Sequence, residues 1–184
     1  DLAVEPGAVL TSGAPDNDTS AESPPTGEHA GTPNDPVDPR GGEANIAGTG
    51  EFTHTGLVYI ISGNKTFAAT ADLTFASGIR IYNNLIVTNL GTLTLENAVV
   101  GQTAASTFIN GENATLETGY YLMNNGILVA SAAGNTIRYA STNWAVNIMG
   151  PQDGIYHNLE ITGSQNKTLL GDITIKGDLS ITST

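Results

Sequence analysis

From residue 51 onward the chain alternates apolar and polar residues in short runs, which are separated by Gly, Asn and Asp. Alternation with a period of two places every second side chain on the same face of a β-strand. The pattern predicts short strands at residues 57–61, 73–75, 85–88, 92–95, 127–130, 136–139, 158–162, 172–175 and 178–181. An apolar stripe of helical spacing is not sustained anywhere in this region, so the sequence predicts very little helix.

Some of these segments resemble one another. Residues 81–88, Ile-Tyr-Asn-Asn-Leu-Ile-Val-Thr, recur as Ile-Tyr-His-Asn-Leu-Glu-Ile-Thr at residues 155–162. Residues 64–67 likewise recur at 166–169, and residues 72–75 recur at 172–175. Imperfect self-similarity among short strands indicates either a β-sandwich or a β-solenoid.

The turns favour the solenoid. Asn125-Gly126 and Asp153-Gly154 are the pairs that would suit the hairpins of a sandwich. Residues 168–181, however, place successive strands only a Gly-Asp or Lys-Gly-Asp apart, which suits the small bends of a solenoid. The predicted fold is therefore an all-β parallel β-solenoid (β-helix), with a β-sandwich as the alternative. At roughly 20 residues per coil, residues 51–184 predict about six or seven coils.

Alternation also predicts which side chains point into this solenoid. One set of apolar residues falls on the inward face of the predicted strands. Its members are Leu85, Val87, Leu93, Leu95, Leu159, Ile161, Ile173, Ile175, Leu179 and Ile181.

The first 50 residues differ in composition from the rest. They contain seven of the eight prolines and nine acidic residues against one basic residue. Such a segment buries too little apolar surface to offset chain entropy. Residues 1–50 are therefore predicted to be an extended acidic Pro/Gly-rich arm or linker, and residues 51–184 to be solenoid repeats. Because neither end of the repeats carries a cap signal, we expect them to belong to a longer array or assembly.

Composition restricts the class of protein. There are 18 acidic and 6 basic residues, for a net charge of −12, which disfavours nucleic acid and anionic membrane surfaces as partners. No apolar run approaches the roughly 20 residues that span a bilayer, so no direct membrane insertion is expected. Charged residues make up 13% of the chain, about half the usual share. Gly, Thr, Asn and Ser replace them, as in many secreted repeat proteins, and cysteine is absent.

The carboxyl-terminal third carries a family resemblance. Its residues are Asn-Thr-Ile-Arg-Tyr-Ala-Ser-Thr-Asn-Trp at 135–144, Gly-Ile-Tyr-His-Asn-Leu-Glu-Ile-Thr-Gly at 154–163 and Lys-Thr-Leu-Leu-Gly-Asp-Ile-Thr-Ile-Lys-Gly-Asp-Leu-Ser-Ile at 167–181. These phrases resemble the repeats of large Bacteroidetes cell-surface proteins, which form β-helical, adhesin-like arrays often exported by the type IX pathway. The resemblance implies a bacterial surface location and a structural or adhesive role, and it supplies no catalytic residues.

Candidate catalytic residues are few. Without cysteine, a nucleophile–base pair would need His29, His54 or His157. His29 lies in the arm, His54 is expected at the entry turn of the solenoid, and His157 aligns with Asn83 as an outward turn residue. The solenoid acids are spread along the chain: Glu51, Asp72, Glu96, Glu112, Glu117, Asp153, Glu160, Asp172 and Asp178.

Glycoside hydrolysis requires two carboxylates about 5–9 Å apart across a groove. We expect no such pair among these acids. Asp72, Asp172 and Asp178 recur just before strands, where turn formation is their simplest role. The chain is therefore predicted not to be an enzyme, and no cofactor is expected.

Two acidic stretches and four Asn-x-Ser/Thr strings have simple interpretations. The stretches 16–18 and 34–38 offer oxygen ligands for Ca²⁺, but Ser20 and Ala21 stand where an EF-hand loop needs a ligand and a glycine. No metal site is therefore predicted. The strings at Asn17, Asn64, Asn113 and Asn166 are predicted to be turns in a bacterial protein.

Five aromatic residues of the second half of the chain could either stack on sugars or fill the core. They are Tyr120, Tyr121, Tyr139, Trp144 and Tyr156. The sequence leaves both roles open.

The sequence thus predicts a non-enzymatic structural or adhesive module of a bacterial cell-surface or extracellular protein. Expected partners are other protein copies or the rest of a larger surface assembly, with glycans as a further candidate. The alternatives are a subunit of an extracellular filament with an intersubunit arm, and a carbohydrate-binding or carbohydrate-cleaving β-helix.

Overall fold

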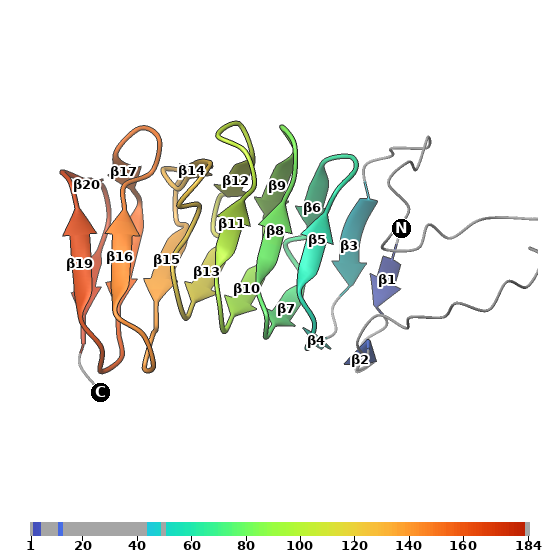
Figure 1. The fold of residues 1–184 in the computed structure, drawn as a ribbon, viewed down its shortest axis with the longest axis horizontal. Helices are drawn as coiled ribbons and strands as arrows, with labels where there is room; N and C mark the ends of the chain where they lie inside the picture. The colour runs from blue at the N-terminus through green and yellow to red at the C-terminus, as the bar shows by residue number, and fades with distance from the viewer. Residues whose placement is uncertain (1, 5–10, 13–43, 49–50, 183–184) are drawn as a thin grey trace, which may run out of the picture.

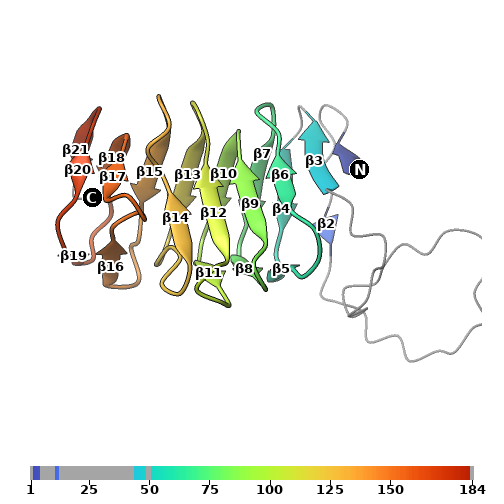
Figure 2. The ribbon, with the colours of Figure 1, turned by 90° about the horizontal axis from the view of Figure 1, so that it is seen from above.

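The computed structural model describes residues 2–4, 11–12, 44–48 and 51–182, and the chain is an all-β parallel β-solenoid of about six turns. Every strand pairing among these residues is parallel. The coils follow one another along the long axis of the molecule, as Figures 1 and 2 show from two sides. The predicted solenoid is confirmed.

The strands form ladders that run along the solenoid. An eight-stranded sheet contains, in order, β2 (Thr11–Ser12), β4 (Glu51–His54), β7 (Asp72–Phe75), β10 (Thr92–Leu95), β13 (Thr115–Thr118), β15 (Thr136–Tyr139), β18 (Asn158–Ile161) and β21 (Leu179–Ile181). A six-stranded sheet contains β1 (Leu2–Val4), β3 (Ala44–Gly48), β6 (Lys65–Phe67), β9 (Ile86–Asn89), β12 (Thr107–Asn110) and β14 (Ile127–Val129).

Three smaller ladders complete the coils. A three-stranded sheet contains β5 (Val58–Ile60), β8 (Ile79–Ile81) and β11 (Val99–Gly101). Two pairs follow toward the carboxyl end: β16 (Val146–Met149) with β19 (Lys167–Leu170), and β17 (Ile155–Tyr156) with β20 (Thr174–Ile175). A single bridge between Ala130 and Tyr156 links the end of the six-stranded ladder to β17.

The register of the eight-stranded sheet sets the length of each coil. Thr92 pairs with Asp72 on the coil before it and with Thr115 on the coil after it. Because the ladder is in register, residues with the same place in successive strands form columns along the solenoid. The column through Leu73, Leu93, Leu116, Ile137 and Leu159 is at most 1% exposed and forms one wall of the core.

The predicted inward face is largely confirmed. Val87, Leu93, Leu95 and Leu159 are buried, and Leu85, Ile161, Ile173 and Ile175 are partly buried against the core. Leu179 and Ile181 continue the columns of Leu159 and Ile161, yet they are 53% and 68% exposed. Among the described strands β21 has a neighbour on one side only, so no described coil covers these two side chains.

The self-similarity between segments 81–88 and 155–162 does not correspond to the coils. The first copy leads into β9 of the six-stranded sheet, whereas the second contains β18 of the eight-stranded sheet. The two copies therefore occupy different faces, and the equivalence of Asn83 and His157 inferred from sequence is wrong. The structural repeat is instead the spacing of strands that pair in register, such as β10, β13 and β15.

Two buried asparagines bridge neighbouring coils inside the solenoid. Asn89 and Asn110 end β9 and β12 and lie side by side in the ladder. The Asn89 side-chain amide donates to Asn110 Oδ1 at 2.8 Å, and Asn110 donates to the carbonyl oxygens of Ala114 and Thr136 at 3.1 Å. These bonds satisfy polar groups that are fully buried, and they tie the six-stranded sheet to the turn at Ala114 and to β15 of the eight-stranded sheet.

Most of the predicted arm, residues 1–50, lies outside the described residues. The described parts of it are β1, β2 and β3, each of which pairs in parallel with the next strand of its ladder. Within the described residues, no helix is long and apolar enough to cross a membrane.

Candidate functional site

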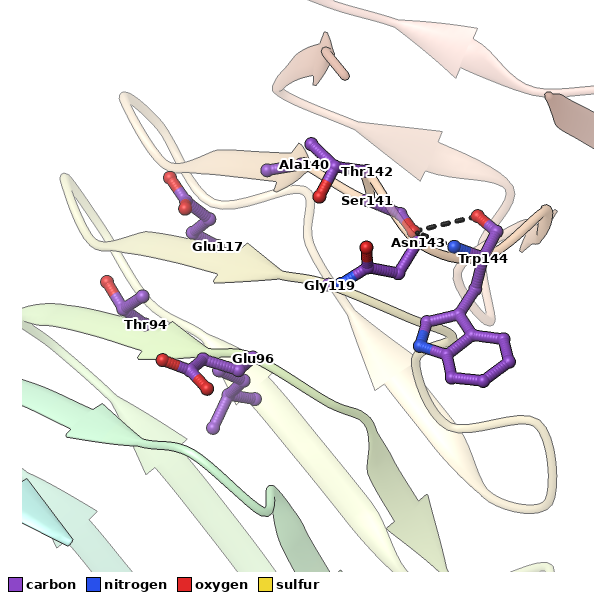
Figure 3. Close-up of a pocket in the computed structure, with 10 residues that line it drawn as sticks. Thr94, Glu96, Glu117, Gly119, Ala140, Ser141, Thr142, Asn143 and Trp144 are labelled. Atoms are coloured by element: carbon purple, nitrogen blue, oxygen red, sulfur yellow. Dashed lines mark hydrogen bonds between the residues drawn. The ribbon is translucent and has the colours of Figure 1, made fainter. Parts of the chain in front are cut away.

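A surface pocket of about 260 Å³ lies where three neighbouring strands of the eight-stranded sheet, β10, β13 and β15, come to their carboxyl ends. Its lining comes from three successive coils and from the loop that connects β15 to β16. The residues that line it are Thr94, Leu95, Glu96, Glu117, Gly119, Ala140, Ser141, Thr142, Asn143 and Trp144 (Figure 3).

Hydrogen bonds hold the 141–144 loop in a defined turn. The buried Ser141 hydroxyl accepts the backbone N–H of Trp144 at 3.0 Å and donates to the Trp144 carbonyl oxygen at 2.7 Å. From the next coil, the Lys167 ammonium donates to the Ser141 carbonyl oxygen at 2.8 Å. Partial burial lowers the pKa of Lys167. The backbone of the 141–144 loop is therefore held by hydrogen bonds within the loop and by one from the next coil.

The floor of the pocket requires a glycine. Gly119 follows β13, and its N–H donates to the carbonyl oxygen of Leu95 on the coil before it. A Cβ atom at Gly119 would lie 2.3 Å from the carbonyl oxygen of Glu96, which is too close for any side chain. The two coils therefore approach each other at this point more closely than a side chain allows.

An aromatic cluster stands at one end of the pocket. The Trp144 side chain is 59% exposed, and its ring lies 6.1 Å from the ring of Tyr120. Tyr120 in turn contacts Tyr121, with ring centroids 4.4 Å apart. Figure 3 shows the indole of Trp144 away from the carboxylates, with Asn143 between them.

The carboxylates occupy the other end. Glu117 lies on β13 and lines the pocket together with the exposed Glu96, which follows β10. Glu117 is also bound to Arg138 on β15, at 2.9 Å, and Arg138 holds Glu160 on β18 through its Nε. The hydrogen bonds that Arg138 donates to Glu160 and then to Glu117 raise the pKa of Arg138. The resulting ion-pair chain Glu117–Arg138–Glu160 joins three coils and fixes the position of Glu117.

Sequence reasoning did not bring these residues together. Glu96 and Glu117 were two of the nine acids spread over residues 51–184, and Trp144 was one of the five candidate aromatic residues between 120 and 156. The register of β10 and β13 is the signal that places the two acids on adjacent coils.

The five aromatics divide into two groups. Tyr139 and Tyr156 are fully buried and belong to the core. Tyr120, Tyr121 and Trp144 form the surface cluster. Of the two roles that the sequence left open, the core role fits the first group, and the second group is placed where a ligand could reach it.

The other candidates lie away from the pocket. His54 is the last residue of β4, rather than a turn residue, and its ring meets that of Phe75 edge-on at 6.3 Å. His157 lies between β17 and β18, with Nδ1 3.2 Å from Asn158 Oδ1. His29, Asp16 and the stretch 34–38 lie outside the described residues.

Several turn predictions can be compared with the backbone. Asp72 begins β7, and Asp172 and Asp178 precede β20 and β21. Asn113 has a positive φ of 58°, which is typical of a turn, and Asn64 Oδ1 accepts the N–H of Ile86 on the next coil. In the part of the chain that the structure describes, no three His, Asp or Glu side chains are grouped so that they could hold a metal ion.

Comparison of the chain with protein-family models, curated proteins and solved structures finds no significant match in any of the three. The resemblance to Bacteroidetes surface repeats is therefore supported only in its coarser part, the β-solenoid architecture.

Proposed function

We propose that this chain is a non-enzymatic structural or adhesive module of a bacterial cell-surface or extracellular protein. Its support is a stack of coils in which each coil buries its apolar columns against the next. A solenoid of this kind extends by adding coils and offers long lateral faces for contacts. The low share of charged residues, 13%, agrees with a surface of short polar side chains.

One observation carries the proposal. The column that is at most 1% exposed from Leu73 to Leu159 continues to Leu179, which is 53% exposed. Beside it, Ile181 is 68% exposed, and β21 presents backbone donors and acceptors along its free edge among the described strands. Leu169 of β19 continues the column of the buried Ile148 and is likewise 47% exposed. Exposed apolar strand edges are contact sites for further strands.

The occupant that fits this surface is a further β-coil in the same register, supplied by another copy or by the rest of a larger assembly. Such a coil would cover these two side chains as the coil of β21 covers Leu159 and Ile161. This observation also favours the second candidate, a filament subunit. The predicted intersubunit arm of that candidate falls mainly on residues outside the described ranges.

The test is the size of residues 1–184, measured by light scattering at several concentrations. We expect the mass to rise with concentration because the exposed columns bind a second copy. Leu179→Lys with Ile181→Lys should keep the chain at the mass of one copy, since buried lysines cannot be solvated. Ser180→Lys, on the outward face of the same strand, is the matched control and should associate like the parent chain. A constant mass of one copy for the parent chain would contradict the proposal that this edge joins copies.

A further inference from the structure

We propose that the pocket beside Trp144 binds an uncharged saccharide unit of a surface or matrix polysaccharide. The inference rests on the proposed adhesive function and specifies its ligand. The site is built from the ends of β10, β13 and β15 and the 141–144 loop, so it is separate from the exposed edge of β21.

The exposed indole of Trp144 suits the apolar face of a sugar ring. A pyranose ring has an apolar face of C–H groups and an equator of hydroxyl groups. Trp144 offers a broad, exposed π-face, and its ring has the Tyr120 ring as a neighbour, with centroids 6.1 Å apart. An exposed Trp of this kind is a platform on which such a ring stacks.

The pocket also contains side-chain oxygens that can accept hydrogen bonds from sugar hydroxyl groups. Carboxylate and amide oxygens from Glu96, Glu117 and Asn143 line the part of the pocket away from the indole (Figure 3). Ionised carboxylates accept hydrogen bonds from hydroxyl groups more strongly than neutral acceptors do. A ligand that stacks at one end and donates hydroxyl protons at the other fits this separation.

The acidic residues of the pocket determine which saccharides it can accept. Glu96 and Glu117 line the pocket, and the ion pair of Glu117 involves Arg138, which Glu160 also neutralises. The chain as a whole has a net charge of −12. Uronic-acid and sulfated polysaccharides are therefore disfavoured, and neutral sugars are preferred.

A small organic cation is the competing ligand, since cations bind over aromatic faces and beside carboxylates. A cation would need the ring and the carboxylates around one atom. Here the carboxylates lie at the far end of the pocket from the indole, and Tyr120 is not among the lining residues. The arrangement favours a ring-shaped polyhydroxylated ligand.

Hydrogen bonds and ion pairs hold the loop and the Glu117 side chain of the pocket in place. Both hydrogen bonds of the Ser141 hydroxyl go to the Trp144 backbone, and Lys167 fixes the Ser141 carbonyl. The ion-pair chain holds Glu117. A preformed site loses little conformational entropy on binding. At about 260 Å³ the pocket is slightly smaller than typical ligand pockets, roughly 300–1,000 Å³. This size suits one unit of a longer glycan that lies across the coils.

The test uses the fact that Trp144 is the only tryptophan of the chain. Its fluorescence therefore reports the pocket alone. The parent chain is titrated with soluble β-1,3-glucan, β-1,4-mannan, xylan, polygalacturonate and tetramethylammonium, and binding is measured in parallel by retardation in gels that contain each polysaccharide. We expect at least one neutral polysaccharide to retard the chain and change its fluorescence, and polygalacturonate and tetramethylammonium to do neither.

Three variants complete the test. Trp144→Ala should weaken retardation by about 10-fold or more, and Glu96→Gln should weaken it several-fold because the charged acceptor is lost. Tyr59→Ala is the matched control, since Tyr59 is also exposed and paired with a second tyrosine, Tyr82, on another face, and it should bind like the parent.

Three outcomes would overturn the inference: no neutral polysaccharide binds, Trp144→Ala binds as well as the parent, or tetramethylammonium alone changes the fluorescence. None of these outcomes depends on the association of copies. Light scattering of the Leu179→Lys, Ile181→Lys variant therefore separates failure of this inference from failure of the proposed function.

Discussion

The hydroxyl groups of Tyr139 and Tyr156 lie 3.2 Å apart in the fully buried core. Tyr156 donates its own proton to the carbonyl oxygen of Met149 at 2.7 Å. Tyr139 must therefore be the donor to Tyr156, and the three groups form a directed chain from β15 through β17 to β16. This chain satisfies two phenols that would otherwise be costly to bury.

The two tyrosines should not be equivalent on substitution. Tyr156→Phe leaves both the Tyr139 hydroxyl and the Met149 carbonyl without their partner, so we expect a loss of about 1–3 kcal/mol. Tyr139→Phe removes only the first donor and should cost about 0.5–1.5 kcal/mol. Urea unfolding followed by circular dichroism measures both. Equal losses would contradict the donor order.

Alkaline pH should destabilise the chain through the same pair. Burial raises the pKa of Tyr156 to about 12, and the bond from Tyr139 offsets part of that rise. Burial, and then the proximity of Tyr156, raises the pKa of Tyr139 well above its usual range. Both phenols deprotonate more easily when unfolded, with a pKa of about 10. Their stabilising effect is complete below about pH 10 and is lost as the pH rises from there through the folded values.

The measurement is the urea midpoint at intervals from pH 8 to pH 12. The parent should lose up to about 1.4 kcal/mol per pH unit for each of the two groups above pH 10. The double variant Tyr139→Phe, Tyr156→Phe should lose less over the same interval. Tyr59→Phe, at an exposed site, should follow the parent. An identical alkaline loss in the double variant would exclude the pair as its cause.

The buried asparagine bridge should not tolerate a charge. In Asn110→Asp the new carboxylate faces the carbonyl oxygens of Ala114 and Thr136, to which the amide now donates. An uncompensated charge at this fully buried site should cost about 3–5 kcal/mol at pH 7. Asn97→Asp, at an exposed position, should change stability by less than about 0.5 kcal/mol. Thermal unfolding of the two variants compares them directly.

The close approach of two coils at Gly119 should be sensitive to a single methyl group. Gly119→Ala places Cβ against the Glu96 carbonyl, and separating the coils should cost about 1–3 kcal/mol. At Gly150 the nearest atom to a new Cβ is Ile173 Cγ2 at 3.4 Å, so Gly150→Ala should be neutral or gain about 0.4–1 kcal/mol. If both variants unfold alike, space at Gly119 is not limiting.

The sequence was sufficient to predict the fold class because period-two alternation and very short turns are local signals. Leu93 and Leu95 face inward as alternation requires, and the same pattern places Tyr139 in the core. The coil repeat was harder to recognise because its length varies: the step from Asp72 to Thr92 is shorter than the step from Thr92 to Thr115. The similarity of 81–88 to 155–162 is more conspicuous in the sequence than the coil repeat is, but the two segments belong to strands of different sheets.

The pocket could not be predicted because its residues are distant in sequence. Glu96, Glu117 and Trp144 follow β10, lie on β13 and follow β15, respectively, so they belong to three successive coils. Only the register of the ladder brings them to the same face. The exposure of Leu179 and Ile181 likewise depends on which strands surround β21, and alternation alone gives no information about that.

The register of the eight-stranded ladder bears on how such a chain can change over evolutionary time. Each coil presents nearly the same columns to the coil before it and to the coil after it. A recombination event that duplicates or deletes one whole coil outside 94–167 therefore keeps the ladder in register and the pocket, with the Glu160 and Lys167 contacts that hold it, intact. The length of the rod and the chemistry of its pocket can then be selected independently, which would suit the adhesive function proposed above.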